Sequence, residues 1–301
     1  MMNFNPLFQR LDQVLMGKPS VIRLSCACLL AGGHLLLEDL PGVGKTTLAH
    51  ALAAAFGLKF SRVQFTSDLL PSDITGFSQY SPQNEPKFIA GPIFSNVLLA
   101  DEINRASPKT QSALLEAMEE YQITVDGKSH ALPTPFFVIA TQNPSDQVGT
   151  FLLPESQRDR FLMCVSLGYP NRQTERSLLE GLDRRELISN LEAFFMPGQL
   201  LLIQKHISEI HASPHVLDYL QNLVETTRND LNTNNHLSTR AVLGILRAAK
   251  ATAAISGRDH VLPDDIQFVW VATTAHRLGN GAGWKASSDL MRAILNNVII
   301  V

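Results

Sequence analysis

The feature that most constrains the fold is a glycine-rich turn, PGVGKTT at positions 41–47, which follows the apolar run LLL at positions 35–37. A turn of this kind between a strand and a helix points backbone N–H groups and the positive end of the helix at an anion. Lys45 adds a mobile positive charge for the β- and γ-phosphates of a nucleotide, and Thr46 adds a hydroxyl for Mg²⁺. The turn therefore predicts a strand–loop–helix unit that binds phosphate.

A second apolar run ends in two carboxylates. Positions 97–100 read VLLA, and Asp101 and Glu102 follow them. A buried strand here would deliver Asp101 to a metal ion and Glu102 to a water molecule. Either half alone is a weak signal, but the two together, in this order, indicate nucleoside triphosphate hydrolysis.

The glycine-rich turn departs from the strict phosphate-loop pattern at one position. That pattern has glycine five positions before Gly44, where this chain has Asp39. A carboxylate that faced a triphosphate would be repelled, so we expect Asp39 to point away from the phosphates. Gly42 and Gly44, where the backbone must pass close to the phosphates, are intact.

Composition and charge narrow the class of protein. The chain has 301 residues, 45% of them hydrophobic and 18% charged, which suits one large globular domain or two ordinary ones. The formal net charge of −3 gives no sequence-independent attraction to nucleic acid or anionic membranes, so only a local basic patch would bind them.

The cysteines, and the absence of a signal-peptide or membrane-span pattern, indicate the cellular compartment that we expect for the protein. Cys26, Cys28 and Cys164 have neither disulfide-framework nor metal-ligand spacing, which predicts buried thiols in a reducing compartment. Positions 1–15 do not read as a signal peptide, and the longest apolar stretch, 26–37, is interrupted by GGH and too short to span a bilayer. We therefore expect a cytoplasmic protein without membrane insertion.

Up to about position 169 the chain alternates short apolar runs with helical stretches. This alternation predicts an α/β core over residues 1–169, a parallel five-stranded sheet with helices on both faces. The expected strands are 35–38, 60–65, 97–101, 136–140 and 161–165, and the expected helices are 45–56 and 107–121. On the second helix we expect a solvated face made by Glu116, Glu119 and Glu120.

Two segments exceed what such a sheet needs. Residues 67–94 lie between the second and third strands, and residues 121–135 read as a hairpin that turns at Asp126–Gly127. Long insertions in a compact domain are either functional or disordered. We favour function, because both insertions would emerge near the nucleotide strands.

After position 169 the strand signals largely vanish. Amphipathic helical patterns cover residues 214–228, 239–256 and 263–278, with Ser238 as an N-cap, Gly257 as a C-cap and Pro263 in a first turn. The pattern predicts a separate all-helical domain over residues 170–301.

Three further residues are candidates for completing a hydrolytic site. Asn143 follows a strand that should end beside the phosphate loop, and it would hold the attacking water or a phosphate oxygen, or else form an ordinary turn before Pro144. Arg160, or its neighbour Arg158, would either pair with Asp159 or enter the site of a neighbouring subunit. An arginine supplied in this way contributes about 10³–10⁵ in rate.

Arg240 is the third candidate, because it opens a helix of the second domain. It would either report the phosphate state to that domain or be a solvated first-turn residue.

Several segments, taken together, resemble the MoxR family of AAA+ ATPases over nearly the whole chain. They are LEDLPGVGKT at 37–46, GPIF at 91–94, LADEINRA at 99–106, ATQNP at 140–144, LPE at 153–155, DRF at 159–161 and the run 238–265. The LADEINRA segment is unusually specific, and the family tolerates aspartate at the position of Asp39.

The resemblance implies an AAA+ core with a helical lid, ATP or ADP bound between them with Mg²⁺, and a homo-oligomeric ring, commonly a hexamer. It makes residues 67–94 the helix-2 insertion and 121–135 the hairpin before the first sensor, both facing the pore or substrate. It also implies the nucleotide contacts Pro41, Gly42, Val43, Gly44, Lys45, Thr46 and Thr47, with Thr46 and Asp101 on the metal side.

The remaining roles follow from the same resemblance. Glu102 would be the base that activates water, Asn143 the first sensor, Arg160 the arginine finger and Arg240 the second sensor. Gly17, in the segment VLMGK at 14–18, would lie beside adenine, although the family's usual glutamine after it is Lys18 here.

Three functions compete at this point. The first is an ATP-driven ring that remodels or matures a protein client, or inserts metal into it, often with a partner that contains a von Willebrand factor A domain. The second is a DNA-tracking or chelatase-like motor, which is disfavoured because the hairpin carries only Lys128 and His130. The third is a nucleotide-gated scaffold in which hydrolysis is incidental.

Overall fold

The computed structural model describes residues 2–81, 84–143, 149–181, 184–196, 198–229, 236–278 and 283–299. Its centre is a five-stranded sheet of β1 (His34–Glu38), β2 (Phe60–Gln64), β5 (Val97–Asp101), β8 (Phe137–Gln142) and β9 (Phe161–Val165). The strands lie in the order β2-β5-β8-β1-β9, and all neighbours are parallel. The predicted parallel sheet of five strands is therefore confirmed.

The strands β5, β8 and β9 are buried along their whole length, because helices cover both faces of the sheet. On one face Leu35 and Leu37 join a core with α1 (Asn5–Val14), α2 (Pro19–Leu30) and α3 (Lys45–Ala55). On the other face Leu36 packs in a second core against α5 (Pro108–Glu120). The alternation along one strand thus places its side chains in two different cores.

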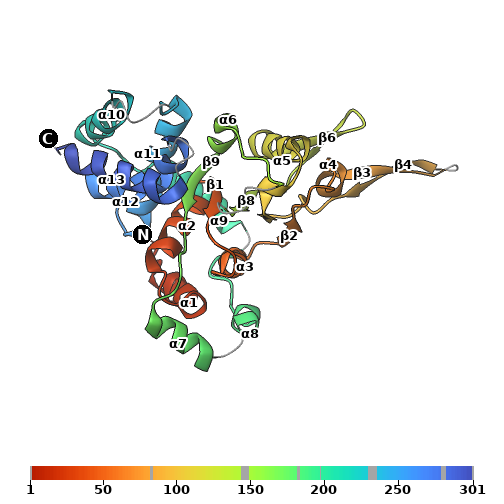
Figure 1. The fold of residues 1–301 in the computed structure, drawn as a ribbon, viewed down its shortest axis with the longest axis horizontal. Coiled ribbons are helices and arrows are strands. Elements are labelled where there is room, and N and C mark those ends of the chain that lie inside the picture. The colour runs from red at the N-terminus through yellow and green to blue at the C-terminus, as the bar shows by residue number, and fades with distance from the viewer. Residues whose placement is uncertain are drawn as a thin grey trace.

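Both insertions form two-stranded hairpins. The first contains α4 (Pro71–Thr75), β3 (Gly76–Ser81) and β4 (Asn84–Ala90), and the second consists of β6 (Gln122–Val125) and β7 (Lys128–Ala131). The predicted turn is present, since Asp126 and Gly127 have φ angles of 49° and 74°. In Figure 1 the β3–β4 hairpin projects from the sheet at the end of the molecule far from the C-terminal helices.

The two hairpins touch each other. The ring of Phe88 in β4 stacks on His130 in β7 at 3.9 Å between centroids, and Tyr80 Oη donates to Asp126 at 3.4 Å. Gly76 is required where the first hairpin begins, because it has a φ of 92° and an added Cβ would lie 2.1 Å from the carbonyl oxygen of Ile89. The pattern of residues 67–94 did not predict this hairpin.

The regular elements described after β9 are all helices, apart from an isolated bridge between His211 and His260. Beyond the short α6 (Glu155–Arg158) before β9, the helices are α7 (Arg172–Glu180), α8 (Arg184–Ser189), α9 (Gln199–Ser208), α10 (Pro214–Asn229), α11 (Thr239–Ile255), α12 (Pro263–Leu278) and α13 (Gly283–Asn297). The three helices expected here correspond to α10, α11 and α12. No helix in the described part of the chain is long and apolar enough to cross a membrane.

The C-terminal helices are joined to the sheet and are not held apart from it. Helices α11 and α12 both contact β9, and their buried side chains belong to the same core as α1–α3. Ser238 caps α11 as predicted, since its Oγ accepts a hydrogen bond from the N–H of Ala241 at 3.0 Å. The division of the chain at residues 169 and 170 stays a prediction.

Candidate active site

The glycine-rich turn lies at the carboxyl edge of the sheet, between β1 and α3. Gly42 and Gly44 have φ angles of 82° and 103°, and Gly44 is the N-cap of α3. The helix N-terminus therefore has no side-chain cap of its own, which suits the binding of an anion by its first N–H groups. Lys45 Nζ donates to the carbonyl oxygens of Asp39 at 2.6 Å and Leu40 at 3.1 Å, so the ammonium group lies against the loop.

The carboxylate of Asp39 turns toward the end of β9. Its Oδ2 accepts from the N–H of Gly168 at 2.7 Å and from Ser166 Oγ at 3.0 Å, and its Oδ1 accepts from the N–H of Leu40 at 2.9 Å. The side chain is thus engaged with backbone and hydroxyl donors, as expected for a residue that replaces glycine here without facing phosphate. It fixes the turn to the chain that follows β9.

The two carboxylates lie at the end of β5, where Thr141 of β8 connects them. Thr141 Oγ1 donates to Asp101 Oδ1 at 2.6 Å and accepts from the N–H of Glu102 at 2.8 Å. Glu102 has a φ of 57°, a left-handed conformation that is uncommon outside glycine. The chain therefore leaves the strand in a turn that directs Glu102 differently from Asp101.

Polar residues of β2 complete this edge, and sequence reasoning missed them. Arg62 forms an ion pair with Asp101 Oδ2 at 2.6 Å, and Gln64 Nε2 donates to Glu102 Oε2 at 2.7 Å. Arg105, which follows Glu102 by three positions, approaches the same carboxylate at 3.3 Å. The sequence does contain a signal for them, because Arg62 and Gln64 are two positions apart on a strand and their side chains must therefore lie on the same face.

The donors at this edge fit a magnesium–nucleotide complex. Among the described residues, no three His, Cys, Asp or Glu side chains converge as a site made by protein alone. Mg²⁺ usually takes one or two protein oxygens together with waters and phosphate oxygens. The carboxylate of Asp101 and the hydroxyl of Thr46 would supply such oxygens, and Asn143, 7% exposed directly after β8, would add an amide. Pro144, which follows it, lies outside the described residues.

A cavity of about 350 Å³ opens beside the phosphate loop. It is lined by Leu15, Met16 and Lys18 from the N-terminal segment, by Gly42 and Val43, and by residues after β9. Gly17 is needed for the turn, because its φ is 73° and an added Cβ would lie 2.8 Å from Thr174 Oγ1. The structure thus brings the VLMGK segment to the loop, with the neighbours of Gly17 forming the wall.

Lys18 has a separate function in this wall. Its Nζ donates to the carbonyl oxygens of Leu167, Gly168 at 3.0 Å and Tyr169 at 2.9 Å. The ammonium group therefore ties the N-terminal segment to the chain after β9, and its charge does not point into the cavity.

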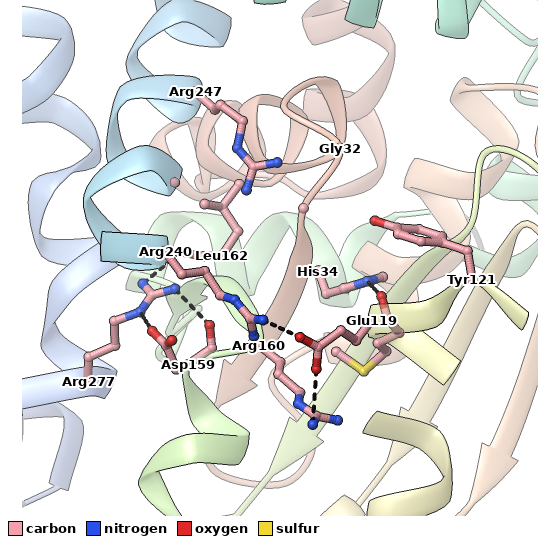
Figure 2. A pocket seen from close by; sticks show the side chains of 13 residues that line it. Gly32, His34, Glu119, Tyr121, Asp159, Arg160, Leu162, Arg240, Arg247 and Arg277 are labelled. Atoms are coloured by element: carbon pink, nitrogen blue, oxygen red, sulfur yellow. Dashed lines mark hydrogen bonds and ion pairs between the residues drawn. The ribbon is translucent and has the colours of Figure 1, made fainter. Parts of the chain in front are cut away.

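The two candidate arginines lie at the other edge of the sheet. Arg160 directly precedes β9, whose first residue pairs with His34 at the start of β1, whereas the phosphate loop follows the last residue of β1. A five-residue strand separates these edges by about 13 Å. Figure 2 shows Arg160 and Arg240 pointing at the same carboxylate, Glu119.

The carboxylate of Glu119 bridges the two arginines. Its Oε2 lies 3.1 Å from Arg160 Nη2, and its Oε1 is hydrogen-bonded to Arg240 Nη2. All three line a cavity of about 210 Å³ between α5, α11 and the start of β1 and β9. The three glutamates of α5 are exposed as expected, but Glu119 is also paired, because α5 ends where α11 packs and both arginines reach it.

Arg158 and Arg160 have different surroundings. Arg160 lines the cavity with Arg240, whereas the Nε of Arg158 is buried without a hydrogen-bond partner. Asp159 between them pairs with Arg277 of α12 at 2.7 Å. The alternative that the arginine before β9 pairs with Asp159 was therefore wrong, since a lid arginine takes that place.

His34 forms the floor of the arginine cavity (Figure 2). Its Nδ1 accepts from the N–H of Val138 at 3.0 Å, which leaves the proton on Nε2, 3.2 Å from the carbonyl oxygen of Met118. Burial lowers the pKa of this imidazole to about 4. His34 is therefore neutral and links β1 and β8 to the end of α5, beside Glu119.

Comparisons with known proteins agree with this architecture. The model of the ATPase family associated with various cellular activities (AAA) matches residues 34–163, and that of the AAA lid domain matches residues 225–295. A structure from Cytophaga hutchinsonii, described as a candidate ATPase, superposes with a TM-score of 0.86 at 35% identity and covers 99% of this chain and 94% of its own. The molecule is an AAA+ ATPase, with the sheet as its nucleotide-binding core and the C-terminal helices as its lid.

The relatives identify the branch of that class. Chaperone MoxR1 of Mycobacterium tuberculosis is 38% identical, with 88% of this chain and 73% of the relative covered. MoxR of Paracoccus denitrificans is 32% identical, with 89% of this chain and 86% of the relative covered. Uncharacterized protein YeaC of Bacillus subtilis is 45% identical over 90% and 85%. The chain belongs to the MoxR family of AAA+ ATPases and is an ATP hydrolase.

A more distant likeness concerns the fold alone. A full-length MCM homologue from Methanopyrus kandleri superposes with a TM-score of 0.60 at 18% identity, and this chain covers 60% of it.

Proposed function

We propose that this protein works as a ring in which each ATP is hydrolysed between two subunits. The observation that carries the proposal is the position of its functional groups. The phosphate loop, Asp101 and Glu102 lie at the carboxyl edge of the sheet, whereas Arg160 and Arg240 lie at the amino edge of the same subunit. Arginines at the opposite edge from their own loop, which is separated from it by a strand length of about 13 Å, are best explained as groups that reach the nucleotide of the next subunit.

Each residue at the carboxyl edge has a role in this proposal. Lys45 moves from the loop carbonyls to the β- and γ-phosphates, and the N–H groups of α3 bind the phosphate oxygens. Thr46 and Asp101 hold Mg²⁺, which neutralises developing charge on the phosphates when bound. Glu102, turned away from the strand and held by Gln64, orients the attacking water, and Asn143 contacts the water or the γ-phosphate.

The cavity beside the loop is the proposed site of the nucleotide base. Its volume of about 350 Å³ is within the range of small-molecule pockets, and its walls include the apolar side chains of Leu15 and Leu167. Val43 of the loop lines the same cavity, and the backbone turns at Gly17, two residues after Leu15. A nucleotide in this place would lie with its base between core and lid segments.

The proposed work of the ring is the remodelling or maturation of a protein client, which includes metal insertion, with a von Willebrand factor A domain protein as partner. We propose a hexamer as the assembly. The relative from Mycobacterium tuberculosis is named a chaperone. On the β3–β4 hairpin, Phe77 and Tyr80 are 52% and 69% exposed, and exposed aromatic side chains suit contact with an apolar polypeptide.

The structure gives less support to a nucleic-acid motor. His130, one of two basic residues on the β6–β7 hairpin, is stacked on Phe88 instead of facing outward. Lys128 is then the main cation of that hairpin for contact with phosphate. Because phosphate neutralisation dominates DNA affinity, a single lysine is a poor tracking surface.

Mixing two inactive variants tests the proposed junction. Arg160→Ala removes the arginine supplied to the neighbour, and Glu102→Gln removes the base of the subunit's own site. Each variant alone should hydrolyse ATP slowly, but mixed rings should recover about a quarter of wild-type turnover, the fraction of random junctions with both groups intact. No recovery from two folded, ring-forming variants would reject hydrolysis between subunits.

The same variants separate a motor from a scaffold. A client that is matured equally by wild-type and Glu102→Gln protein would show that hydrolysis is incidental. The motor requires maturation to stop when ATP is bound but not cleaved. A motor should hold its client on the Glu102→Gln ring in the presence of ATP and release it when wild-type subunits replace the variant subunits. A scaffold should not show this difference.

A further inference from the structure

Both carboxylate oxygens of Asp159 are bound by the lid. Arg277 of α12 donates through Nε to Oδ1 at 2.7 Å, and Ser238 donates through Oγ to Oδ2 at 3.0 Å. Ser238 is also the N-cap of α11, the helix on which Arg240 is the second residue. One side chain next to Arg160 therefore connects the segment before β9 to two lid helices.

Arg277 holds the backbone on both sides of Arg160. Its side chain is 7% exposed, and its Nη2 donates to the carbonyl oxygens of Asp159 at 3.2 Å and Phe161 at 2.7 Å. Its Nη1 donates to the carbonyl oxygen of Leu162 at 3.2 Å. A buried guanidinium needs a charged partner, and Asp159 is the carboxylate that provides it.

The same arrangement sets the spacing of the two arginines. Arg160 follows Asp159 directly, and Arg240 lies two residues after Ser238, which bonds to that carboxylate. Figure 2 shows Asp159 and Arg277 on one side of the cavity, with Arg160 and Arg240 converging on Glu119. If the phosphate oxygens of a triphosphate took the place of the Glu119 carboxylate, they would meet the guanidinium groups of Arg160 and Arg240 at a spacing that is already set.

We infer that Asp159 is a positioning residue for hydrolysis between subunits, which holds Arg160 and Arg240 in one rigid relation so that both meet a single triphosphate. The inference rests on the proposed function, because it assigns those arginines to the neighbour's nucleotide. It adds that core and lid present them as one unit. Asp159 itself touches no substrate in this scheme.

The lid contains a matched control for Asp159. Asp265 accepts from both terminal nitrogens of Arg258, at 2.6 and 2.7 Å, and its side chain is 2% exposed. It also caps α12 by accepting from the N–H of Leu262 at 2.8 Å. This pair is a buried ion pair of the same kind, and neither partner lines the arginine cavity.

The test compares Asp159→Asn with Asp265→Asn in the full-length protein assembled with MgATP. Both variants should unfold at lower temperature than wild type. Asp159→Asn should also lower kcat for ATP hydrolysis on the order of 100-fold, because small displacements of positioned groups have effects of that size. Its affinity for ATP should stay near that of wild type, while Asp265→Asn should keep near wild-type kcat.

Complementation distinguishes positioning from general damage. Asp159→Asn subunits have an intact site of their own, so mixing them with Glu102→Gln subunits should restore about a quarter of wild-type turnover. A loss that Glu102→Gln subunits do not rescue, or a wild-type kcat in the variant, overturns the inference. Wild-type protein without any hydrolysis would instead reject the proposed function.

Ser238 provides a second test if Asp159→Asn does not fold. Ser238→Ala removes the hydroxyl that donates to Asp159, and Ser238→Thr keeps it. Turnover should fall in the alanine variant and return in the threonine variant. Equal turnover in all three proteins would overturn the inference.

Discussion

The two edges of the central sheet are built in different ways. At the carboxyl edge, the functional groups follow directly from strand ends, as Lys45 does after β1 and Glu102 after β5. At the amino edge, Glu119, Arg160 and Arg240 come from three elements that meet only when α11 packs against the core. The first edge is fixed by local sequence, and the second depends on tertiary packing.

Under the proposed hydrolysis between subunits, this difference would let a change in one lid act on chemistry in the next subunit. The phosphate loop and the two carboxylates at the carboxyl edge are placed by β1 and β5 of the core. The amino edge presents its arginines only while α11 and α12 hold the segment before β9. Nucleotide binding and nucleotide cleavage should therefore respond separately to substitutions.

The largest effect on hydrolysis is expected at Arg160, and it should distinguish this residue from Arg158. Arg160→Ala should lower kcat by about 10³–10⁵, because it removes charge stabilisation from the transferred phosphoryl group. Arg158→Ala should leave kcat near wild type, since Arg158 does not line the arginine cavity. Steady-state ATPase assays, with ATP affinity measured separately, check both results. The reverse order of effects would assign the finger to Arg158.

A smaller effect is expected at the carboxyl edge from restoring the strict glycine of the phosphate loop. Asp39→Gly removes a carboxylate that accepts from Ser166 and Gly168. Because buried donors lose a charged partner, the free energy of unfolding should fall by about 3 kcal/mol. Denaturant titration measures this, with Asp39→Asn as a milder control. Tighter ATP binding without loss of stability would show that Asp39 opposes the phosphates.

The smallest effect concerns the floor of the amino edge and depends on pH. His34 is neutral in the folded protein because burial holds its pKa at about 4, below the usual 6.5. As the pH drops, His34 is protonated in the unfolded chain before it is protonated in the folded protein. The free energy of unfolding therefore falls as the pH drops from 6.5 toward 4. At pH 5 the contribution lost should be about 2 kcal/mol.

Unfolding experiments at pH 7 and pH 5 on wild type and His34→Gln measure that contribution. The variant should lose less stability between the two pH values. Some dependence should remain, because burial also lowers the pKa of His276 well below its usual range. An identical pH dependence in both proteins would contradict the assignment to His34.

The sequence predicted the sheet and the carboxyl edge because both depend on short-range patterns. Four of the five strands contain a compact apolar run, β2 being more polar, and the phosphate loop and Asp101–Glu102 lie within a few residues of a strand end. Helix α5 was predicted from its cap, and Ser107 does accept from the N–H of Thr110 at 3.3 Å. At these positions the local sequence pattern and the burial in the folded protein favour the same secondary structure.

The missed features depend on contacts between distant segments. The β3–β4 hairpin has a weak strand signal because it is exposed, and its Phe88 is held by His130 of another hairpin. The pairing of Glu119 with arginines 41 and 121 positions later has no local signature. The bond from Arg277 to Asp159, across 118 positions, is of the same kind. Such contacts follow from packing alone.

The stacking of Phe88 on His130 has a mechanical consequence. The β6–β7 hairpin continues from α5, which carries Glu119, and leads through residues 132–136 into β8, which ends beside Asn143. A force on one hairpin would therefore reach the other, and through it Glu119 at one edge of the sheet and Asn143 at the opposite edge. Under the proposed function, contact of a hairpin with a polypeptide would be coupled by this path to the nucleotide site.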